Sequence, residues 1–182
     1  MTARTLPDRV PTILGSRVVL RAWADGDGDV VVRAGTDPHI TGTTSVTPHG
    51  TKGDALAFVV RQRGRLRDGF GYSFAIADTS TGEAVGMIGL WVRDLPDGRA
   101  SIGYWVDPAR RGRGYSTDAL TTLSEWALGH EEVHTLQLAV EPWNEGSWRA
   151  AQACGFAREG LMRSWQVARG ERRDMYRSAK VR

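Results

Sequence analysis

A change in residue pattern between positions 101 and 140 places the strongest constraint on the fold. Residues 101–106 (SIGYWV) have the composition of a β-strand, and a glycine-rich segment follows directly. From about Ser116 to Leu128 apolar residues recur at helical spacing, and Thr135–Val140 (TLQLAV) returns to strand character. The order strand, helix, strand predicts a crossover connection within a mixed α/β fold.

The flanking sequence predicts further strands and helices. Residues 72–77 and 84–92 are strand-like runs separated by DTSTGE, and LPDGR leads into residues 101–106, so the three runs should form an antiparallel meander. Between residues 35 and 53, Thr, Pro, Gly and His dominate, which favours an irregular loop with helical turns. The other expected strands are residues 17–21, 160–167 and 172–179, the last two joined by a turn at Arg169–Gly170, and the other expected helices are residues 25–34, 54–66 and 145–153.

Composition narrows the class of protein. With 182 residues, of which 41% are apolar and 25% charged, the chain is expected to form one domain over residues 1–182. A net charge of +3 is too small to indicate a nucleic-acid surface. No apolar run approaches the roughly 20 residues of a membrane span, and residues 1–11 lack the apolar core of a secretory signal. The one cysteine, Cys154, excludes an intrachain disulfide and favours a reducing compartment, so we predict a cytoplasmic protein.

The segment RRGRGYS (residues 110–116) carries the clearest chemical signal. It lies between an expected strand and an expected helix, and Gly112 and Gly114 allow the backbone to turn sharply and approach a ligand closely. Amides at a helix N-terminus lack internal partners and attract phosphate. The segment is neither a P-loop nor a dinucleotide fingerprint, because it lacks the residues and spacing of both. Taken alone, it is either a phosphate-binding turn or a plain glycine-rich turn.

In its wider context this segment resembles the signature of the GNAT superfamily of N-acetyltransferases, Gln/Arg-x-x-Gly-x-Gly/Ala. Arg111 and Gly114 align with that signature, and Ser116 replaces its final small residue. The stretches GEAVGMIGLW, SIGYWVDPARRGRGYSTDAL and VEPWNEGSWRAAQACGFAREGLMR are similar to the RimJ/RimL branch, which acetylates ribosomal-protein N-termini. The likeness covers about residues 15–179. It implies a mostly antiparallel, twisted sheet of about seven strands with helices on both faces.

The resemblance also implies a cofactor site and a reaction. Acetyl-CoA would be the cosubstrate, without a metal. Backbone from Trp105 to Val106 would face its pantetheine arm at a splay between this strand and the Thr135–Val140 strand, where an amide could polarise the thioester carbonyl. Asn144 would bind the pantetheine, and Ser147 would be the candidate acid for the leaving thiolate, although the same pair is also typical of a simple helix start. The amides expected to hold the pyrophosphate are those of Arg111, Gly112, Arg113, Gly114, Tyr115 and Ser116.

The base that takes the proton from the acceptor amine is not identified by the sequence. Relatives often carry Glu immediately before the Ile-Gly-Tyr of the central strand, where this chain has Ser101. Water could also relay the proton. The remaining candidates are Glu141, Glu159, Asp37 and His39.

The acceptor itself has two open alternatives, a protein N-terminus or a small-molecule amine. Its site is expected to be built largely by residues 35–53 and the turn near Arg169. A non-catalytic acyl-CoA-binding module is the alternative function, because the Glu is missing at position 101. The resemblance also implies a possible homodimer.

Two short matches are interpreted as coincidental. Residues 130–134 (HEEVH) fit the zinc-protease pattern, but Gly129 precedes them and a strand-like run follows, so they should straddle a helix end and a loop. The acidic run DGDGD (residues 25–29) lacks the later ligands of an EF-hand and is better explained as a helix start. Cys154 is expected to be a small buried packing residue.

Overall fold

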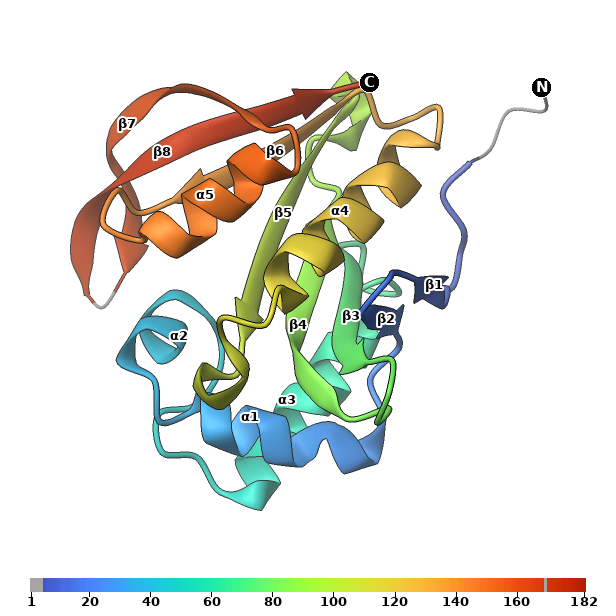
Figure 1. The fold of residues 1–182 in the computed structure, drawn as a ribbon, viewed down its shortest axis with the longest axis vertical. Helices are drawn as coiled ribbons and strands as arrows, with labels where there is room; N and C mark the ends of the chain where they lie inside the picture. The colour runs from blue at the N-terminus through green and yellow to red at the C-terminus, as the bar shows by residue number, and fades with distance from the viewer. Residues whose placement is uncertain (1–4, 169) are drawn as a thin grey trace.

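The computed structural model describes residues 5–168 and 170–182. This part of the chain forms a twisted sheet of eight strands in the order β1-β2-β3-β4-β5-β6-β8-β7 (Figure 1). Neighbouring strands are antiparallel except for β5 and β6, which are parallel because α4 crosses over between them. The strands are β1 (Ile13–Leu14), β2 (Val18–Arg21), β3 (Gly71–Asp78), β4 (Ala84–Trp91), β5 (Arg99–Val106), β6 (Thr135–Val140), β7 (Ala157–Ala168) and β8 (Glu171–Val181).

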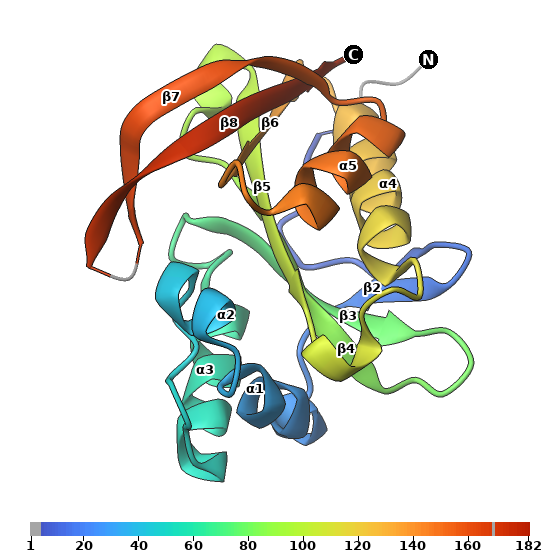
Figure 2. The same cartoon turned by 60° about the vertical axis from the view of Figure 1, so that its left-hand side comes forward.

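Helices cover both faces of the sheet, as the sequence predicts. Figure 2 shows α4 and α5 on one side of β5, and α1, α2 and α3 on the other. The helices are α1 (Gly28–Ala34), α2 (Pro38–Thr43), α3 (Lys52–Gly64), α4 (Tyr115–Leu128) and α5 (Glu145–Ala153). The predicted mixed α/β class is therefore confirmed.

The central strands are buried on both faces. Along β3, Phe74 packs into the cluster under α4, while its neighbour Ala75 packs into the cluster under α1 and α3. Ile88 and Met87 on β4 divide in the same way. Successive side chains of a strand point to opposite faces, so one core forms on each face of the sheet. β5 contributes to both cores, through Ile102 and Val106 on one face and Trp105 on the other.

The two parallel strands diverge. β5 pairs with β6 only through Arg99–Thr135, Ala100–Leu136 and Ser101–Gln137. Beyond these residues β5 stays on β4 as far as Val106, and β6 stays on β8 as far as Val140. Figure 1 shows the two strands close together near the C-terminus and separating toward α2. The sheet therefore opens into a gap in its middle, below the paired residues.

Several element bounds differ from the predicted ones. Helix α2 is one of the helical turns expected within residues 35–53, although its bounds were not predicted; Asp37 caps it and Pro38 occupies its first position. Helix α3 starts two residues earlier than predicted, since Thr51 and Asp54 form a capping box. The short strand β1 was not predicted. Of the predicted turn at Arg169–Gly170, Arg169 lies outside the described residues, and Gly170 adopts a φ of 77°.

Candidate active site

Two clefts meet at the gap between β5 and β6. One, called the α4 cleft, has a volume of about 860 Å³ and is lined by Asp37, Arg111, Gly112, Gly114, Ser116 and Ala150, among others. The other, called the hairpin cleft, has a volume of about 1010 Å³ and is lined by Phe70, Trp91, Ser101, Glu141, Trp165 and Arg177, among others. The described residues that line both clefts are His39, Thr43, Tyr104, Trp105, Asn144 and Ser147. A ligand in either cleft can therefore reach the same few side chains.

The first turn of α4 forms one end of the α4 cleft. Gly112 and Gly114 have φ values of 76° and 80°, the left-handed region that favours glycine. The amide of Asp118 donates to the carbonyl of Gly114 at 3.0 Å, so the amides of residues 115–117 precede this hydrogen bond. They lie at the positive end of the helix dipole and line the cleft. The geometry of an anion-binding turn is therefore present.

The predicted pyrophosphate residues are arranged unevenly around this turn. Arg111, Gly112, Gly114, Tyr115 and Ser116 line the α4 cleft. Arg113 is exposed and is not among the described residues that line it. Its contact with a ligand stays a prediction.

The start of α4 is held against the sheet by two carboxylates. The hydroxyl of Tyr115 donates to Asp78 at the β3–β4 turn, and this bond raises the pKa of Tyr115. Hydrogen bonds from Ser80 and then from Tyr115 lower the pKa of Asp78. Asp118 accepts from the amides of Arg17 and Val18, at 2.7 and 3.0 Å. The turn is thus fixed in place by contacts outside the cleft.

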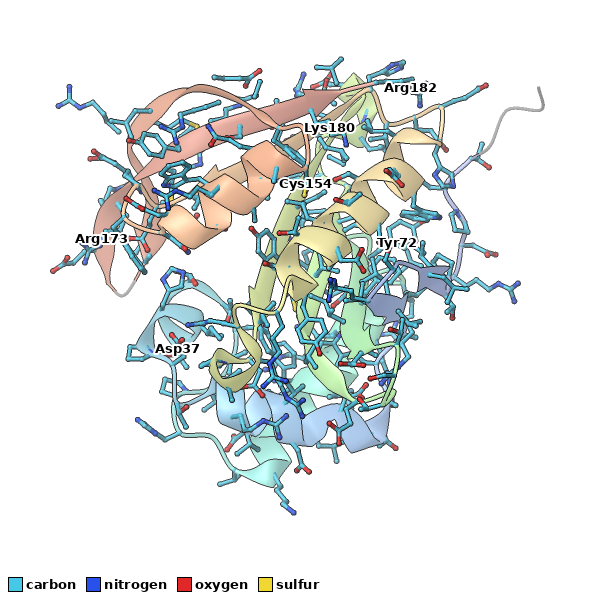
Figure 3. The ribbon with its side chains drawn as sticks, viewed as in Figure 1. Asp37, Tyr72, Cys154, Arg173, Lys180 and Arg182 are labelled. Atoms are coloured by element: carbon cyan, nitrogen blue, oxygen red, sulfur yellow. The ribbon has the colours of Figure 1, made fainter. Side chains whose placement is uncertain are left out.

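Arg111 connects this turn to α2 and β5. Its guanidinium lies 2.7 Å from Asp37 and 3.3 Å from the carbonyl of Val106. Partial burial acts to raise the pKa of Asp37, but hydrogen bonds from the amides of Ile40 and His39 and from Arg111 outweigh it, so the pKa is lowered. Asp37, labelled beside α2 in Figure 3, lines the α4 cleft and is already held by several donors. These contacts argue against Asp37 as the base.

The backbone at the end of β5 faces the gap at Val106. The amide of Asp107 donates to Val85 on β4 at 2.8 Å. Backbone groups of successive strand residues point to opposite edges, so the N–H and C=O of Val106 point away from β4, toward the gap, and those of Trp105 point toward β4. The Trp105 side chain is 5% exposed and packs in the core beside Phe58. Of the two residues predicted to face the pantetheine, Val106 is the one with a suitably directed amide.

Asn144 and Ser147 belong to the start of α5. The Asn144 Oδ1 accepts from the amide of Ser147 at 3.3 Å, so the predicted helix-start role is present. Its Nδ2 lies 3.2 Å from Nε2 of His39. The Ser147 hydroxyl lies 2.8 Å from that of Tyr104 on β5. Both predicted side chains therefore line the junction of the clefts and also have partners in the protein.

Tyr104 is the residue that sequence reasoning missed. It lies in the middle of a strand-like run, where an aromatic residue is interpreted as packing. Burial raises the pKa of its hydroxyl, which keeps it protonated at neutral pH. Its position near the end of β5, a few residues before the glycine-rich turn, is the one signal that could have identified it.

The four candidate bases do not lie together. His39 and Glu141 meet beside the gap, with Nδ1 of His39 3.5 Å from Oε2 of Glu141. Glu159 lies on the exposed strand β7, paired with Arg177 at 3.1 Å, and is not among the described residues that line either cleft. Asp37 pairs with Arg111, as described above. Of the four candidates, His39 and Glu141 lie together beside the gap, and the identity of the base stays a prediction.

The motifs interpreted as coincidental are structural. His130 follows the end of α4 and its Nδ1 lies 2.8 Å from the carbonyl of Trp126, while His134 immediately precedes β6. Within residues 5–168 and 170–182, no group of three His, Cys, Asp or Glu is placed to hold a metal ion. In the same ranges, no helix has the length and apolar character needed to span a membrane. Cys154 is 6% exposed and packs in the core, as predicted.

Comparisons with known proteins agree with this arrangement. Residues 17–157 match the model of the acetyltransferase (GNAT) domain. The chain is 27% identical over 165 residues to an uncharacterized N-acetyltransferase, p20, of Bacillus licheniformis, which covers 91% of this chain and 93% of that protein.

Solved structures give the same result. The chain superposes on Mycobacterium smegmatis RimJ in complex with CoA-disulfide with a TM-score of 0.80 and 25% identity, covering 96% of this chain and 89% of that one. The microcin C7 self-immunity acetyltransferase MccE, solved with acetyl-CoA and AMP, shares the fold with a TM-score of 0.80 and 18% identity, covering 92% and 93%. The predicted resemblance to the RimJ/RimL branch is thus confirmed. The chain belongs to the GNAT acetyltransferase family.

Proposed function

We propose that this protein transfers the acetyl group of acetyl-CoA to a primary amine. The α4 cleft would hold acetyl-CoA, and the hairpin cleft would hold the amine. The observation that carries the proposal is that the two clefts share one set of side chains at the gap between β5 and β6. Direct transfer needs donor and acceptor to meet at such a junction, with the reacting atoms in contact.

The residues of the α4 cleft fit the chemistry of a CoA pyrophosphate. The free amides at the start of α4 and the left-handed turn at Gly112 and Gly114 suit a phosphate group. Arg111 lies beside them, with its guanidinium 2.7 Å from Asp37, and could extend a second donor to a phosphate. The pantetheine arm would then run along the gap toward Tyr104 and Ser147. RimJ and MccE, which share the fold, were solved with CoA-disulfide and acetyl-CoA, and this supports the assignment.

The junction residues would assist both halves of the transfer. The amine nitrogen forms a bond to the acetyl carbon, the carbon–sulfur bond breaks, and the thiolate takes up a proton. The amide of Val106 is directed into the gap and would stabilise the developing oxyanion. The hydroxyls of Ser147 and Tyr104 form one hydrogen-bonded pair that would donate the proton to the thiolate.

Both a protein N-terminus and a small-molecule amine remain acceptors to test. The resemblance to the RimJ/RimL branch, which acetylates ribosomal-protein N-termini, makes a peptide N-terminus the first choice to test. The large hairpin cleft, with exposed aromatic rings of Phe70 and Trp165 along it, has room for a peptide chain. A non-catalytic acyl-CoA-binding module would bind acetyl-CoA without transferring it.

The proposal is tested by amine-dependent release of free CoA thiol. Purified protein is incubated with acetyl-CoA and, in separate reactions, peptides of differing N-terminal residue and small amines such as spermidine. Mass spectrometry of the acceptor identifies the acetylated product. We expect thiol release that depends on one acceptor class, with a mass gain on the amine. Binding of acetyl-CoA without transfer to any amine would instead identify the non-catalytic module.

A further inference from the structure

A buried carboxylate, Glu141, lies where β6 leaves the sheet and lines the hairpin cleft. Its side chain is 3% exposed. A carboxylate removed from water in this way needs charged or hydrogen-bonding partners nearby. Among the described residues, the charged and titratable groups that face it include His39 on α2 at 3.5 Å and Arg173 on β8 at 3.9 Å. Figure 3 labels Arg173 on the hairpin above α2.

The orientation of His39 follows from its contact with Asn144. Because Asn144 Oδ1 accepts from the amide of Ser147, its Nδ2 is the atom that faces His39. An amide nitrogen can only donate, so Nε2 of a neutral His39 accepts this bond and the ring proton lies on Nδ1. Nδ1 is the nitrogen that faces Glu141. The Trp143 ring, 4.7 Å away at 82°, packs edge to face with the imidazole.

We propose that Glu141 accepts the proton of the attacking amine and that His39 is a positioning residue that directs its carboxylate. This inference rests on the proposed acetyl transfer. Before attack, the protonated amine gives one proton to an Oε atom of Glu141, which releases it to water. The neutral nitrogen then bonds to the acetyl carbon and the carbon–sulfur bond breaks. The thiolate takes a proton from the Tyr104–Ser147 pair, and the second proton that leaves the nitrogen restores the pair through water, so charge and atoms balance.

Other carboxylates of the hairpin cleft are less suited to this step. Asp68 is paired with Arg67 at 3.0 Å and is about half exposed. Asp94 follows β4, and its carbonyl accepts from the amide of Arg99 at 3.1 Å, so it lies at the start of β5 and not at the Trp105–Val106 end. Glu141 contacts His39, which lines both clefts, so it lies beside the point where the amine must meet the thioester. Glu141 would therefore supply the carboxylate that relatives often carry at the position of Ser101.

The test compares Glu141→Gln with wild type in the thiol-release assay, using the acceptor found for wild type and hydroxylamine, which is neutral at the assay pH. We expect kcat with the protonated acceptor to fall about 10²- to 10⁴-fold, with the KM for acetyl-CoA unchanged. The loss should shrink as pH rises, and it should be small with hydroxylamine. Glu159→Gln, an exposed carboxylate on β7, serves as the matched control and should behave as wild type.

The positioning role of His39 needs a separate variant. His39→Ala should lose about tenfold in kcat, and His39→Asn should recover part of it, because the Asn amide can replace the Nδ1–H donor.

Two outcomes for Glu141→Gln would overturn the proposal. Equal losses of kcat at every pH and with both acceptors would show that Glu141 is structural, and an unchanged kcat would show that it is not the base. If wild type transfers acetyl and Glu141→Gln matches it, only the Glu141 assignment fails. If wild type transfers to no amine, both proposals fail.

Discussion

The hydroxyls of Tyr104 on β5 and Ser147 on α5 lie 2.8 Å apart, across the point where the sheet opens. This contact joins β5 to α5 at the junction of the α4 cleft and the hairpin cleft. It also pairs a residue that the sequence singled out with one that it did not. In the proposed reaction, this hydrogen-bonded pair would be the acid that protonates the thiolate.

Removing either hydroxyl should slow the transfer without weakening acetyl-CoA binding greatly. We expect Tyr104→Phe and Ser147→Ala each to reduce kcat by roughly 10- to 100-fold, and the double variant to lose little more, because the two hydroxyls act as one unit. Steady-state kinetics of the three variants measures this. Fully additive losses would show that the hydroxyls act independently.

The pH profile offers a second view of the same pair. Burial raises the pKa of Tyr104 above the ordinary tyrosine value of about 10. The protonated form is the acid, so activity should persist through neutral pH and decline only as pH rises through this raised pKa. Comparison of kcat against pH for wild type and Tyr104→Phe would separate its alkaline limb from other causes. A limb that is identical in both proteins would assign it to another group.

Asn144 has two structural contacts that can be separated by substitution. Asn144→Asp keeps an oxygen to cap α5 but loses the donor to His39, whereas Asn144→Ala loses both. We expect Asn144→Ala to lower the free energy of unfolding by about 1 kcal/mol, and Asn144→Asp to leave it nearly unchanged. Both should reduce acetyl transfer. Denaturant unfolding beside the activity assay checks this, and an Asn144→Asp variant with full activity would contradict it.

Asp37 should make stability depend on acid pH. Its pKa is lowered on folding, so its stabilisation is present above the unfolded value of about 3.9 and is lost as pH falls through the lower folded value. Asp37→Asn keeps a good helix cap but removes the charge that Arg111 contacts. Wild type should therefore be the more stable protein at neutral pH, with the difference shrinking in acid. Urea unfolding of both proteins from neutral to acid pH measures this. A difference in the free energy of unfolding that stayed constant with pH would refute the prediction.

Much of this fold could be predicted because its signals are local. The change from strand to helix spacing after Val106 and the glycines of the turn each act through their own neighbours. Asp37 and Pro38 also carry a helix-start signal, although the surrounding Thr and Gly residues obscured α2. The divergence of β5 from β6 was expected only from the family resemblance, because residues 99–101 resemble the rest of the strand and carry no local signal for it.

The candidate site was only partly predictable for the same reason. Asn144 and Ser147 stand three residues apart in one recognisable motif. His39 and Glu141 are brought together by topology across most of the chain, and neither position differs from an ordinary surface polar residue in sequence. Tyr104 was not identified, because an aromatic residue within a strand-like run is usually a packing residue. Long-range contacts of this kind depend on the whole fold.

The most direct test of the central claim is a titration with acetyl-CoA, followed by the intrinsic fluorescence of the seven tryptophans, of which Trp105 and Trp143 line the α4 cleft. Gly114→Glu adds a negative charge to the turn that lines the α4 cleft, at a position where a Cβ would lie 3.7 Å from the Arg17 side chain. Gly82→Glu is the matched control, since Gly82 has a similar φ of 74° and lies in the β3–β4 turn. We expect saturable binding by wild type and Gly82→Glu, and at least a tenfold weaker Kd, about 1.4 kcal/mol, for folded Gly114→Glu. Equal binding by all three proteins, or no binding by wild type, would contradict the assignment of the α4 cleft to acetyl-CoA.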